Sequence, residues 1–262
     1  MTGSAEKGRI TPVLATIAVV AIVACAGYFV LRVRSGGGGS SLPMATTPAS
    51  SPSPSASATE TAPTRWLVAK ARGTVAVYRQ PSVSAAVRAT LPKLNEHGQP
   101  TLMLVRETRK VDGVTWYSVW LPVRPNGSSG WVRASGVRTF ASMARIVIDV
   151  SARRLSVYVK GSLKGRFRVA VGSSTYRTPS GLFFISEKVR PSPPDGFYGV
   201  LAMGLSGVQP KLPTRGSLAI HGTNDGGGIG RAITEGCIRM HNADVLKVSA
   251  WVPSGSPVVI IR

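Results

Sequence analysis

The sequence predicts a mostly β protein that carries one transmembrane helix near its N-terminus. Apolar runs after residue 65 are short and rich in Val, Ile and aromatic residues, with turn-forming residues between them. Runs of this kind, repeated every ~8–12 residues, are typical of antiparallel β barrels and sandwiches. Residues 10–31 form a long uncharged run and are expected to be the helix. A low-complexity segment separates the two regions.

The uncharged run is 22 residues long and contains no Asp, Glu, Lys or Arg. As a helix it would span roughly 30 Å, one hydrocarbon core. We therefore expect residues 1–34 to be a cytoplasmic tail and a signal-anchor helix. Two alternatives stay open: residues 22–25 have the pattern of a lipobox whose Cys25 would be lipidated, or the run is a cleaved secretory signal. Basic residues flank the run equally, so charge alone leaves its orientation open.

Residues 35–64 are expected to be a disordered linker. The segment contains four consecutive glycines, and 22 of the 25 residues from Ser40 to Thr64 are Ser, Thr, Pro or Ala. Such a composition cannot bury enough apolar surface to offset the entropy lost on ordering. A coil of this length reaches roughly 30 Å, so it would hold the folded part above the membrane.

Composition limits the choice of partner. The chain has 262 residues, 43% of them hydrophobic, and 32 Lys and Arg against 11 Asp and Glu give a net charge of +21. This charge favours an anionic partner. It is spread over both halves of the chain without a nucleic-acid-binding motif, so we expect no nucleic-acid partner. The two cysteines exclude a disulfide-rich scaffold.

Residues 65–140 are expected to form a first, small β module. Candidate strands cover residues 73–78, 101–107, 115–121 and 130–133. The short strands and the ending Ser129-Gly130-Trp131-Val132 resemble a bacterial SH3-like barrel, which implies a cell-wall-binding role. The module shows no catalytic constellation. His97 is expected to be a surface loop residue, and three tryptophans are expected in the core: Trp116, Trp120 and Trp131.

Residues 141–262 are expected to form a second, sandwich-like β domain with one short helix. Strands are predicted over residues 145–150, 155–159, 165–171, 182–187, 217–221 and 258–261, with a loop over 190–196. Residues 242–251 have apolar side chains at partly helical spacing, and Asn242 is the candidate N-cap.

Cys237 is the candidate nucleophile of this domain. Cys25 lies in the predicted membrane run and cannot pair with it, so Cys237 is expected to be a free thiol. Gly236 before it permits a tight turn, and Arg239 adds a positive charge. The start of the predicted helix at residue 242 would lower the pKa of the thiol, and the surrounding amides could hold an oxyanion. A buried structural cysteine is the alternative.

A thiol nucleophile needs a base. His221 ends a predicted strand sixteen residues before Cys237, and a glycine-rich stretch between them could fold the two together. No Asp or Asn is an obvious third group, so the carbonyl of Gly222 is the candidate that orients the ring. His241 is expected to face solvent. A zinc site of Cys237, His221 and His241 would lack paired ligand spacing, so we expect no metal and no cofactor.

Together these residues resemble the signature of the L,D-transpeptidases, the YkuD-type catalytic domain. The matching segments are His221-Gly222-Thr223, the glycine-rich spacer, residues 236–240 (Gly-Cys-Ile-Arg-Met) followed by Asn242 and Asp244, the T-P-x-G-like Thr178-Pro179-Ser180-Gly181, and residues 253–261. The resemblance covers residues 144–262. The anchor, linker and SH3-like module match an actinobacterial-type architecture.

The resemblance implies an enzyme that cross-links peptidoglycan. Cys237 would attack the carbonyl between residues three and four of a stem tetrapeptide, release D-alanine and form a thioester. A side-chain amine of a second stem would resolve the thioester into a 3→3 cross-link. His221, oriented by Gly222, would activate the thiol and return a proton to the leaving amine. The residues expected to hold the oxyanion or the substrate are Gly236, Arg239, Thr223 and Thr234.

The same resemblance implies partners and a location. The partners would be donor and acceptor stem peptides, anionic cell-wall polymers, and carbapenem-type β-lactams that acylate Cys237. The protein would cross the membrane once, through residues 10–31, with its catalytic domain facing the cell wall. Glu235 departs from the family, since many members carry histidine there, and a carboxylate beside the thiol would raise its pKa. The alternatives are an L,D-carboxypeptidase, with water as acceptor, and a non-catalytic cell-wall-binding protein.

Overall fold

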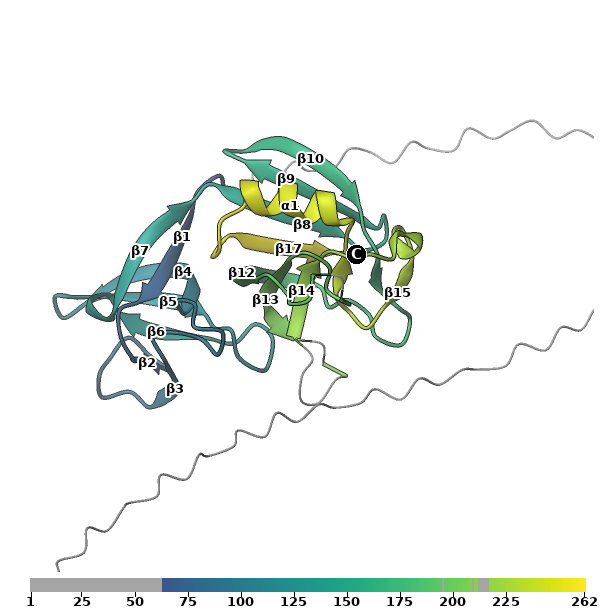
Figure 1. Cartoon of the computed structure of the whole chain (residues 1–262). Coiled ribbons are helices and arrows are strands. Elements are labelled where there is room, and N and C mark those ends of the chain that lie inside the picture. The colour runs from purple at the N-terminus through teal and green to yellow at the C-terminus, as the bar shows by residue number, and fades with distance from the viewer. Residues whose placement is uncertain (1–62, 195, 209, 212–216) are drawn as a thin grey trace, which may run out of the picture. The chain divides into compact units, whose positions relative to one another are not determined.

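The computed structural model describes residues 63–194, 196–208, 210–211 and 217–262, all of which belong to one compact unit. Two β modules follow one another along this part of the chain (Figure 1). The predicted membrane run and nearly all of the predicted linker lie outside the described residues. Within the described ranges, no helix has the length and apolarity needed to cross a membrane.

The first module is an antiparallel sheet. Its strands are β1 (Trp66–Ala71), β2 (Val75–Tyr78), β3 (Val87–Leu91), β4 (Leu102–Val111), β5 (Val114–Trp120), β6 (Ser129–Arg133) and β7 (Val137–Ser142), with the 3-10 turn η1 (Ala134–Gly136) before β7. They are arranged in the order β3-β2-β6-β5-β4-β1-β7 around a small apolar core. All four predicted strands are present. The strands β1, β3 and β7 are not among the predicted ones: polar residues interrupt β3 and β7, whereas β1 is apolar apart from Lys70. The SH3-like classification stays a prediction.

The tryptophans of this module differ in burial. Trp116 is in the core, as predicted. Trp120 and Trp131 are half-buried, and each ring lies beneath an arginine: the guanidinium of Arg106 is 4.3 Å from the ring centroid of Trp120, and that of Arg109 is 4.9 Å from that of Trp131. Trp120 also packs against the buried cluster of Val68, Leu102, Leu104 and Phe184, so the prediction of a core position holds in part for it. The prediction is wrong for Trp131, which belongs to no buried cluster of the described residues and whose ring contacts a cation.

The second module is built on a mixed sheet. Its strands are β8 (Ala144–Asp149), β9 (Arg154–Val159), β10 (Ser162–Arg168), β12 (Gly181–Val189), β13 (Ala202–Val208), β14 (Ser217–His221), β16 (Ile238–Arg239) and β17 (Pro257–Ile261). They follow the order β10-β9-β8-β17-β12-β13-β14-β16, in which β8–β17 and β14–β16 are parallel pairs. A separate parallel pair joins β11 (Val171–Gly172) and β15 (Ala232–Thr234), and the 3-10 turn η2 (Gly226–Gly228) precedes β15.

The core of this module lies inside the curved sheet. Ile146 of β8, Ile185 of β12 and Ile220 of β14 belong to one buried cluster, so both arms of the sheet face the same interior. A β-bulge between Ile185 and Glu187 interrupts the register of β12, the strand that joins the arms. Helix α1 (Asn242–Trp251), labelled in Figure 1, packs on this module, and two of its valines are buried. The prediction of a mostly β domain with one helix is confirmed.

Helix α1 has the predicted bounds, but its N-cap is His241 and not Asn242. Asn242 is the first helical residue, and its side chain bonds to two loops. Its Oδ1 accepts a hydrogen bond from the N–H of Val200 at 3.2 Å, and its Nδ2 donates to Asn224 Oδ1 at 2.6 Å. Contacts with these loops therefore occupy the side chain that the sequence assigns to capping.

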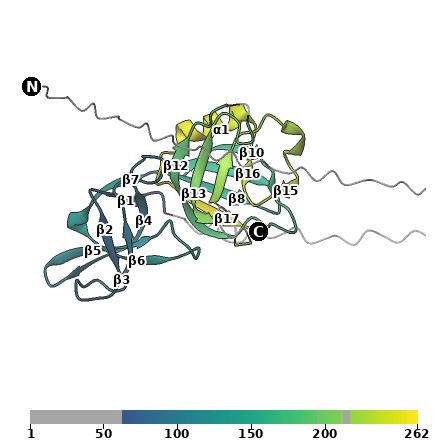
Figure 2. The same ribbon diagram turned by 60° about the horizontal axis from the view of Figure 1, so that its bottom comes forward.

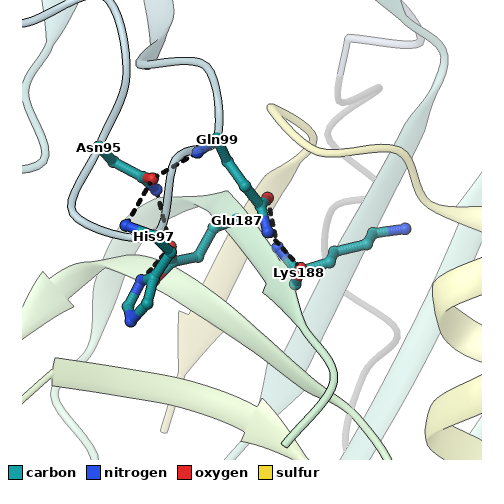
Figure 3. A network of polar contacts seen from close by, with 5 residues as sticks. All are labelled: Asn95, His97, Gln99, Glu187 and Lys188. Carbon is teal, nitrogen blue, oxygen red and sulfur yellow. Dashed lines mark hydrogen bonds and ion pairs between the residues drawn. The ribbon is translucent and has the colours of Figure 1, made fainter.

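The two modules share a packed interface at β12, which lies with β13 on the side of the second module that faces the first (Figure 1 and Figure 2). Val68, Leu102 and Leu104 of the first module form one buried cluster with Phe184 of β12. Beside it, Gln99 Nε2 donates to the carbonyl of Lys188 at 2.6 Å, and the N–H of Lys188 donates to Gln99 Oε1 at 3.2 Å (Figure 3). Gln99 thus bonds to β12 as a neighbouring strand would.

His97 is an exposed loop residue, as predicted, and it also contacts the second module at this interface. Its Nδ1 lies 2.7 Å from Oε2 of Glu187, and Nδ2 of Asn95 donates to the same oxygen at 2.7 Å (Figure 3). The His97 side chain remains 47% exposed. Its partner lies 90 residues away in the sequence, so local sequence gave no sign of this contact.

Candidate active site

Cys237 and His221 lie on neighbouring strands of the second module. His221 ends β14, and Cys237 directly precedes β16. The parallel register aligns Ile220 with Ile238 and His221 with Arg239. Both isoleucines belong to the core cluster. Because side chains alternate along a strand, His221, Arg239 and Cys237 lie on the other face of the sheet.

Two threonine hydroxyls hold the turn that presents Cys237. Thr178 is fully buried; its Oγ1 accepts from the N–H of Gly172 at 2.8 Å and donates to the carbonyl of Gly236 at 2.9 Å. Thr234 Oγ1 accepts from the N–H of Gly236 at 3.1 Å and donates to the carbonyl of Cys237 at 2.6 Å. Gly236 has φ +115°, which residues with a side chain rarely adopt. The T-P-x-G segment thus acts through its threonine, which anchors this turn.

Replacing Thr178 by Val is expected to lower the free energy of unfolding by about 2–4 kcal/mol, because two buried backbone groups lose their partner. Urea denaturation of the full-length protein measures the change. Thr101→Val is the matched control: Thr101 is also buried, but its hydroxyl has no hydrogen-bond partner among the described residues. Its removal is expected to be neutral or slightly stabilising. Equal losses in the two variants would contradict this role of Thr178.

His221 is held as a neutral base. Its Nδ1 lies 2.7 Å from the carbonyl oxygen of Gly222, the hydrogen bond that the sequence analysis expects. A carbonyl only accepts, so Nδ1 carries the proton and Nε2 keeps a lone pair. Burial lowers the pKa of His221 to about 4; the bond to Gly222 acts in the opposite direction, and Arg239 lowers it further. At pH 7 the ring is therefore neutral.

Two aromatic residues that no sequence motif pointed to cover His221. The ring centroids of Phe197 and Tyr198 lie 5.5 Å and 5.0 Å from that of His221. Phe197 also lies beneath the guanidinium of Arg239, at 5.0 Å. The signal that could have found them is an aromatic pair next to glycines, Gly196-Phe197-Tyr198-Gly199, directly after a proline-rich loop. These rings exclude water from one side of the imidazole.

The Cys237 thiol forms its hydrogen bond with a backbone carbonyl and not with His221. Its Sγ donates to the carbonyl of Ser217 at 3.7 Å. Nε2 of His221 is buried and has no hydrogen-bond partner in the part of the chain that the structure describes. The structure therefore brings the two side chains to one face of the sheet without forming the thiol–imidazole bond.

The pKa of the Cys237 thiol is raised, which corrects the expectation that the helix would lower it. Burial is the largest cause; a backbone hydrogen bond at Ala219 and the charge of Arg239 act against it, and Glu235 raises the pKa further. Helix α1 begins five residues after Cys237, too far for its N-terminal dipole to dominate. The resting pair is thus a neutral thiol beside a neutral imidazole.

Glu235→Gln is expected to lower the pKa of Cys237 and speed its alkylation at pH 7 by about two- to fivefold, since a screened carboxylate near the thiol disfavours thiolate. Arg239→Gln is expected to slow it. The measurement is the pH profile of iodoacetamide alkylation in a Cys25→Ala background, which leaves one thiol. Glu107→Gln removes a carboxylate from β4 of the first module and serves as the control. A Glu235→Gln profile that matches the parent would contradict the electrostatic role.

The other predicted site residues are placed as follows. The N–H of Gly236 already donates to Thr234, which corrects its assignment to the oxyanion and leaves the amide of Cys237 as the candidate. Thr223 and Asp225 form a local turn, in which the Thr223 hydroxyl accepts from the N–H of Asp225 at 3.1 Å. Arg239 Nε is buried and unpartnered among the described residues. His241 is exposed, and these residues include no group of three potential metal ligands.

The second module is a mostly β domain that carries a thiol and a neutral imidazole on one face of adjacent strands, the two residue types that cysteine–histidine acyl transfer requires. The family follows from the comparison with known proteins: residues 143–260 match the model of the YkuD family, the L,D-transpeptidase catalytic domain. The second module is therefore similar to YkuD L,D-transpeptidase catalytic domains.

The similar proteins include bacterial relatives and solved structures. The YkuD proteins of Bacillus subtilis (strain 168) and Bacillus licheniformis are 34% and 37% identical over 117 and 116 residues, which are 45% and 44% of this chain. The match spans 65% and 64% of those relatives. An L,D-transpeptidase from Mycobacterium smegmatis is 14% identical with a TM-score of 0.38, over 61% of this chain and 99% of that chain. L,D-transpeptidase 3 from Mycobacterium tuberculosis is 15% identical with a TM-score of 0.41, over 73% and 95%.

Proposed function

We propose that this chain is a peptidoglycan L,D-transpeptidase with Cys237 as its nucleophile. The observation that carries the proposal is the buried, neutral His221, whose Nε2 lone pair lies on the sheet face that also bears Cys237. A thiol with a base within reach is the minimum for thiol acyl transfer. A rotation of the Cys237 side chain away from the carbonyl of Ser217 would bring the pair together. The YkuD domain supplies the reaction class, transfer of an acyl group.

The reaction proceeds in two balanced halves. In the first, Nε2 of His221 takes the thiol proton as Sγ of Cys237 attacks the donor carbonyl. The C–N bond to the terminal D-alanine breaks, and Nε2 returns the proton to the leaving amine. In the second, a neutral amine of the acceptor stem attacks the thioester, a new C–N bond forms and the C–S bond breaks. The surplus amine proton returns through His221 to the thiolate, so no oxidant or cofactor is needed.

The surroundings support these steps. The amide of Cys237 would donate to the oxyanion, and the unpartnered Nε of Arg239 would bond to a substrate carboxylate. Phe197 and Tyr198 would keep water from the thioester. A carbapenem would enter the same path as a strained acyl donor whose opened ring stays bound to Cys237. Thr223 and Thr234 would act by shaping the backbone around the site.

We further propose that residues 10–31 anchor the chain in the cell membrane and that residues 35–64 let the catalytic domain reach the cell wall outside it. The net charge of +21 would favour contact with carboxylate- and phosphate-rich wall polymers. The first module would contribute to that contact.

The test is product analysis with the full-length protein and disaccharide-tetrapeptides, by chromatography with mass spectrometry. The expected products are free D-alanine and dimers joined between two third-position residues. Tripeptide monomers without dimers would assign an L,D-carboxypeptidase. No turnover, combined with retention on isolated sacculi that is unchanged by Cys237→Ala, would assign a non-catalytic wall-binding protein.

A further inference from the structure

A cavity of about 290 Å³ lies between the two modules, next to the candidate active site. Residues from the loop 92–101 of the first module line one side, and residues of β12, β13 and β14 line the other. Ser217 is among the lining residues, and its carbonyl accepts the hydrogen bond from the Cys237 thiol at 3.7 Å. The cavity therefore ends one hydrogen bond away from the candidate nucleophile.

The sheet register connects this cavity to the thiol along one row of residues. Glu187 of β12 is aligned with Gly204 of β13, and Gly204 with Ala219 of β14. The parallel register of β14 and β16 aligns Ile220 with Ile238, so Cys237, the residue before β16, extends the row from Ala219 by one position. At about 4.8 Å per strand, the backbones of Glu187 and Cys237 are about 14 Å apart. Between them lie only a glycine and an alanine, so the row forms a floor without large side chains.

The cavity is acidic although the protein is strongly basic. Glu187 and Glu96 line it, and its described lining includes no Lys, Arg or His. Lys188 follows Glu187 directly, but its side chain extends away and donates to the carbonyl of Ser249 (Figure 3). Although His97 contacts Glu187, two carboxylates without a Lys or Arg in the described lining attract a cation to this cavity on a protein of charge +21.

The Glu187 carboxylate is held over the floor. Asn95 and His97 both bond to its Oε2 (Figure 3). The other oxygen, Oε1, lies beside Gly204: a Cβ added to this glycine would be 2.9 Å from it. The first module thus fixes one oxygen and leaves the other directed over the row that leads to Cys237.

Thr101 gives an independent indication of a ligand. It lines the cavity, is 6% exposed, and its Oγ1 is buried without a hydrogen-bond partner among the described residues. Burial of an unpaired hydroxyl is unfavourable, and a polar ligand group in the cavity would satisfy it. The cavity lining therefore contains both carboxylates and a hydroxyl without a hydrogen-bond partner among the described residues.

We propose that this cavity is the subsite for the amine-bearing side chain of the acceptor. The assignment rests on the proposed transpeptidase function, in which the acceptor brings an ammonium group and the residue that leaves the donor ends in a carboxylate. Glu187 and Glu96 attract the ammonium group of the acceptor and repel the carboxylate of the residue that leaves the donor. The ammonium group binds at Oε1 of Glu187, and the side chain then advances over Gly204 and Ala219 toward the thioester, losing a proton to water before the attack.

A binding experiment without turnover tests the subsite. Full-length Cys237→Ala protein is titrated with pentylammonium while the amide resonances of Gly204, Gly207 and Ala219 are followed by NMR, with neutral 1-pentanol as the matched probe. We expect pentylammonium to shift these resonances, and Glu187→Gln to weaken its binding about tenfold, the loss of one charge-assisted hydrogen bond. Equal shifts with pentanol, or equal binding to Glu187→Gln, would overturn the proposal.

The matched variants separate binding from structure. Asn95→Ala removes a hydrogen bond between the modules but keeps both carboxylates. If Asn95→Ala weakened pentylammonium binding as much as Glu187→Gln, the role of Glu187 would be to hold the modules together. That result would overturn the proposal. Glu96→Gln, in an exposed loop position, is expected to weaken binding severalfold, whereas Glu107→Gln, on β4 outside the cavity, leaves it unchanged. The subsite is supported if binding is lost most in Glu187→Gln, less in Glu96→Gln and not at all in Glu107→Gln. Any other order contradicts it.

A second experiment tests whether the subsite takes part in catalysis. With wild-type thioester enzyme, the ratio of aminolysis by pentylamine to hydrolysis is measured against amine concentration. Glu187→Gln is expected to raise the half-saturating amine concentration about tenfold, and an unchanged value would contradict the subsite. If no thioester forms on the wild type, the proposed function fails, while the NMR titration still decides whether the cavity binds an ammonium group.

Discussion

Cys237→Ala is expected to abolish covalent acylation of the protein by a carbapenem. The wild-type chain should gain one adduct mass and the variant none, because Cys237 is the proposed nucleophile and its sulfur would open the ring. Intact-mass spectrometry of the full-length protein measures the result directly. The same variant should form no cross-linked dimer from stem peptides, a loss of all turnover above background.

The chain offers a matched control, since it has two cysteines. Cys25→Ala should keep the adduct and the turnover, because Cys25 lies in the predicted membrane run and not in the catalytic domain. Cys237→Ser tests the nucleophile more finely: an alcohol activated by a neutral imidazole should acylate far more slowly than the thiol. An adduct that persists in Cys237→Ala would contradict the assignment of the nucleophile.

His221→Gln is expected to slow acylation by about 10²–10⁴-fold, the usual contribution of a general base. Glutamine keeps a polar side chain of similar reach but cannot take the thiol proton. The measurement is the rate of carbapenem adduct formation under single-turnover conditions. His241→Gln is the control, since His241 is exposed at the start of α1 and should change the rate less than twofold. A similar loss in both variants would show that the effect is structural.

The pH dependence of stability follows from the same histidine. Its pKa is about 4 in the folded protein, below the ordinary histidine value of 6.5, so the unfolded chain binds a proton between these values and the folded protein does not. Stability therefore falls as the pH drops from 6.5 to 4, by about 3 kcal/mol in total for this group. Urea denaturation at pH 7 and pH 4 should show a larger loss for wild type than for His221→Gln. Parallel losses would contradict the burial of a neutral imidazole.

Local patterns located the elements that carry the site. The apolar run ending at His221 predicts β14, and its bounds are confirmed, as are those of α1. The strand β13 was not found, because Gly204 and Gly207 interrupt its apolar alternation. These glycines have a tertiary reason: a Cβ at Gly204 would meet Glu187, and one at Gly207 would meet Phe183. A pattern that weakens a strand prediction thus reflects close packing.

The sequence by itself determined the class of the second module, its candidate thiol and its candidate base, because residue types and their spacing are local properties. Only the tertiary structure decided the state of these groups. The pKa of Cys237 is raised and that of His221 lowered chiefly by burial, which depends on segments far away in the chain. In the same way, the contact of His97 with Glu187 joins the two modules, and residues of both modules line the cavity that reaches Ser217. Such contacts cannot be predicted from local sequence, because they form between residues that are far apart in the chain and meet only on folding.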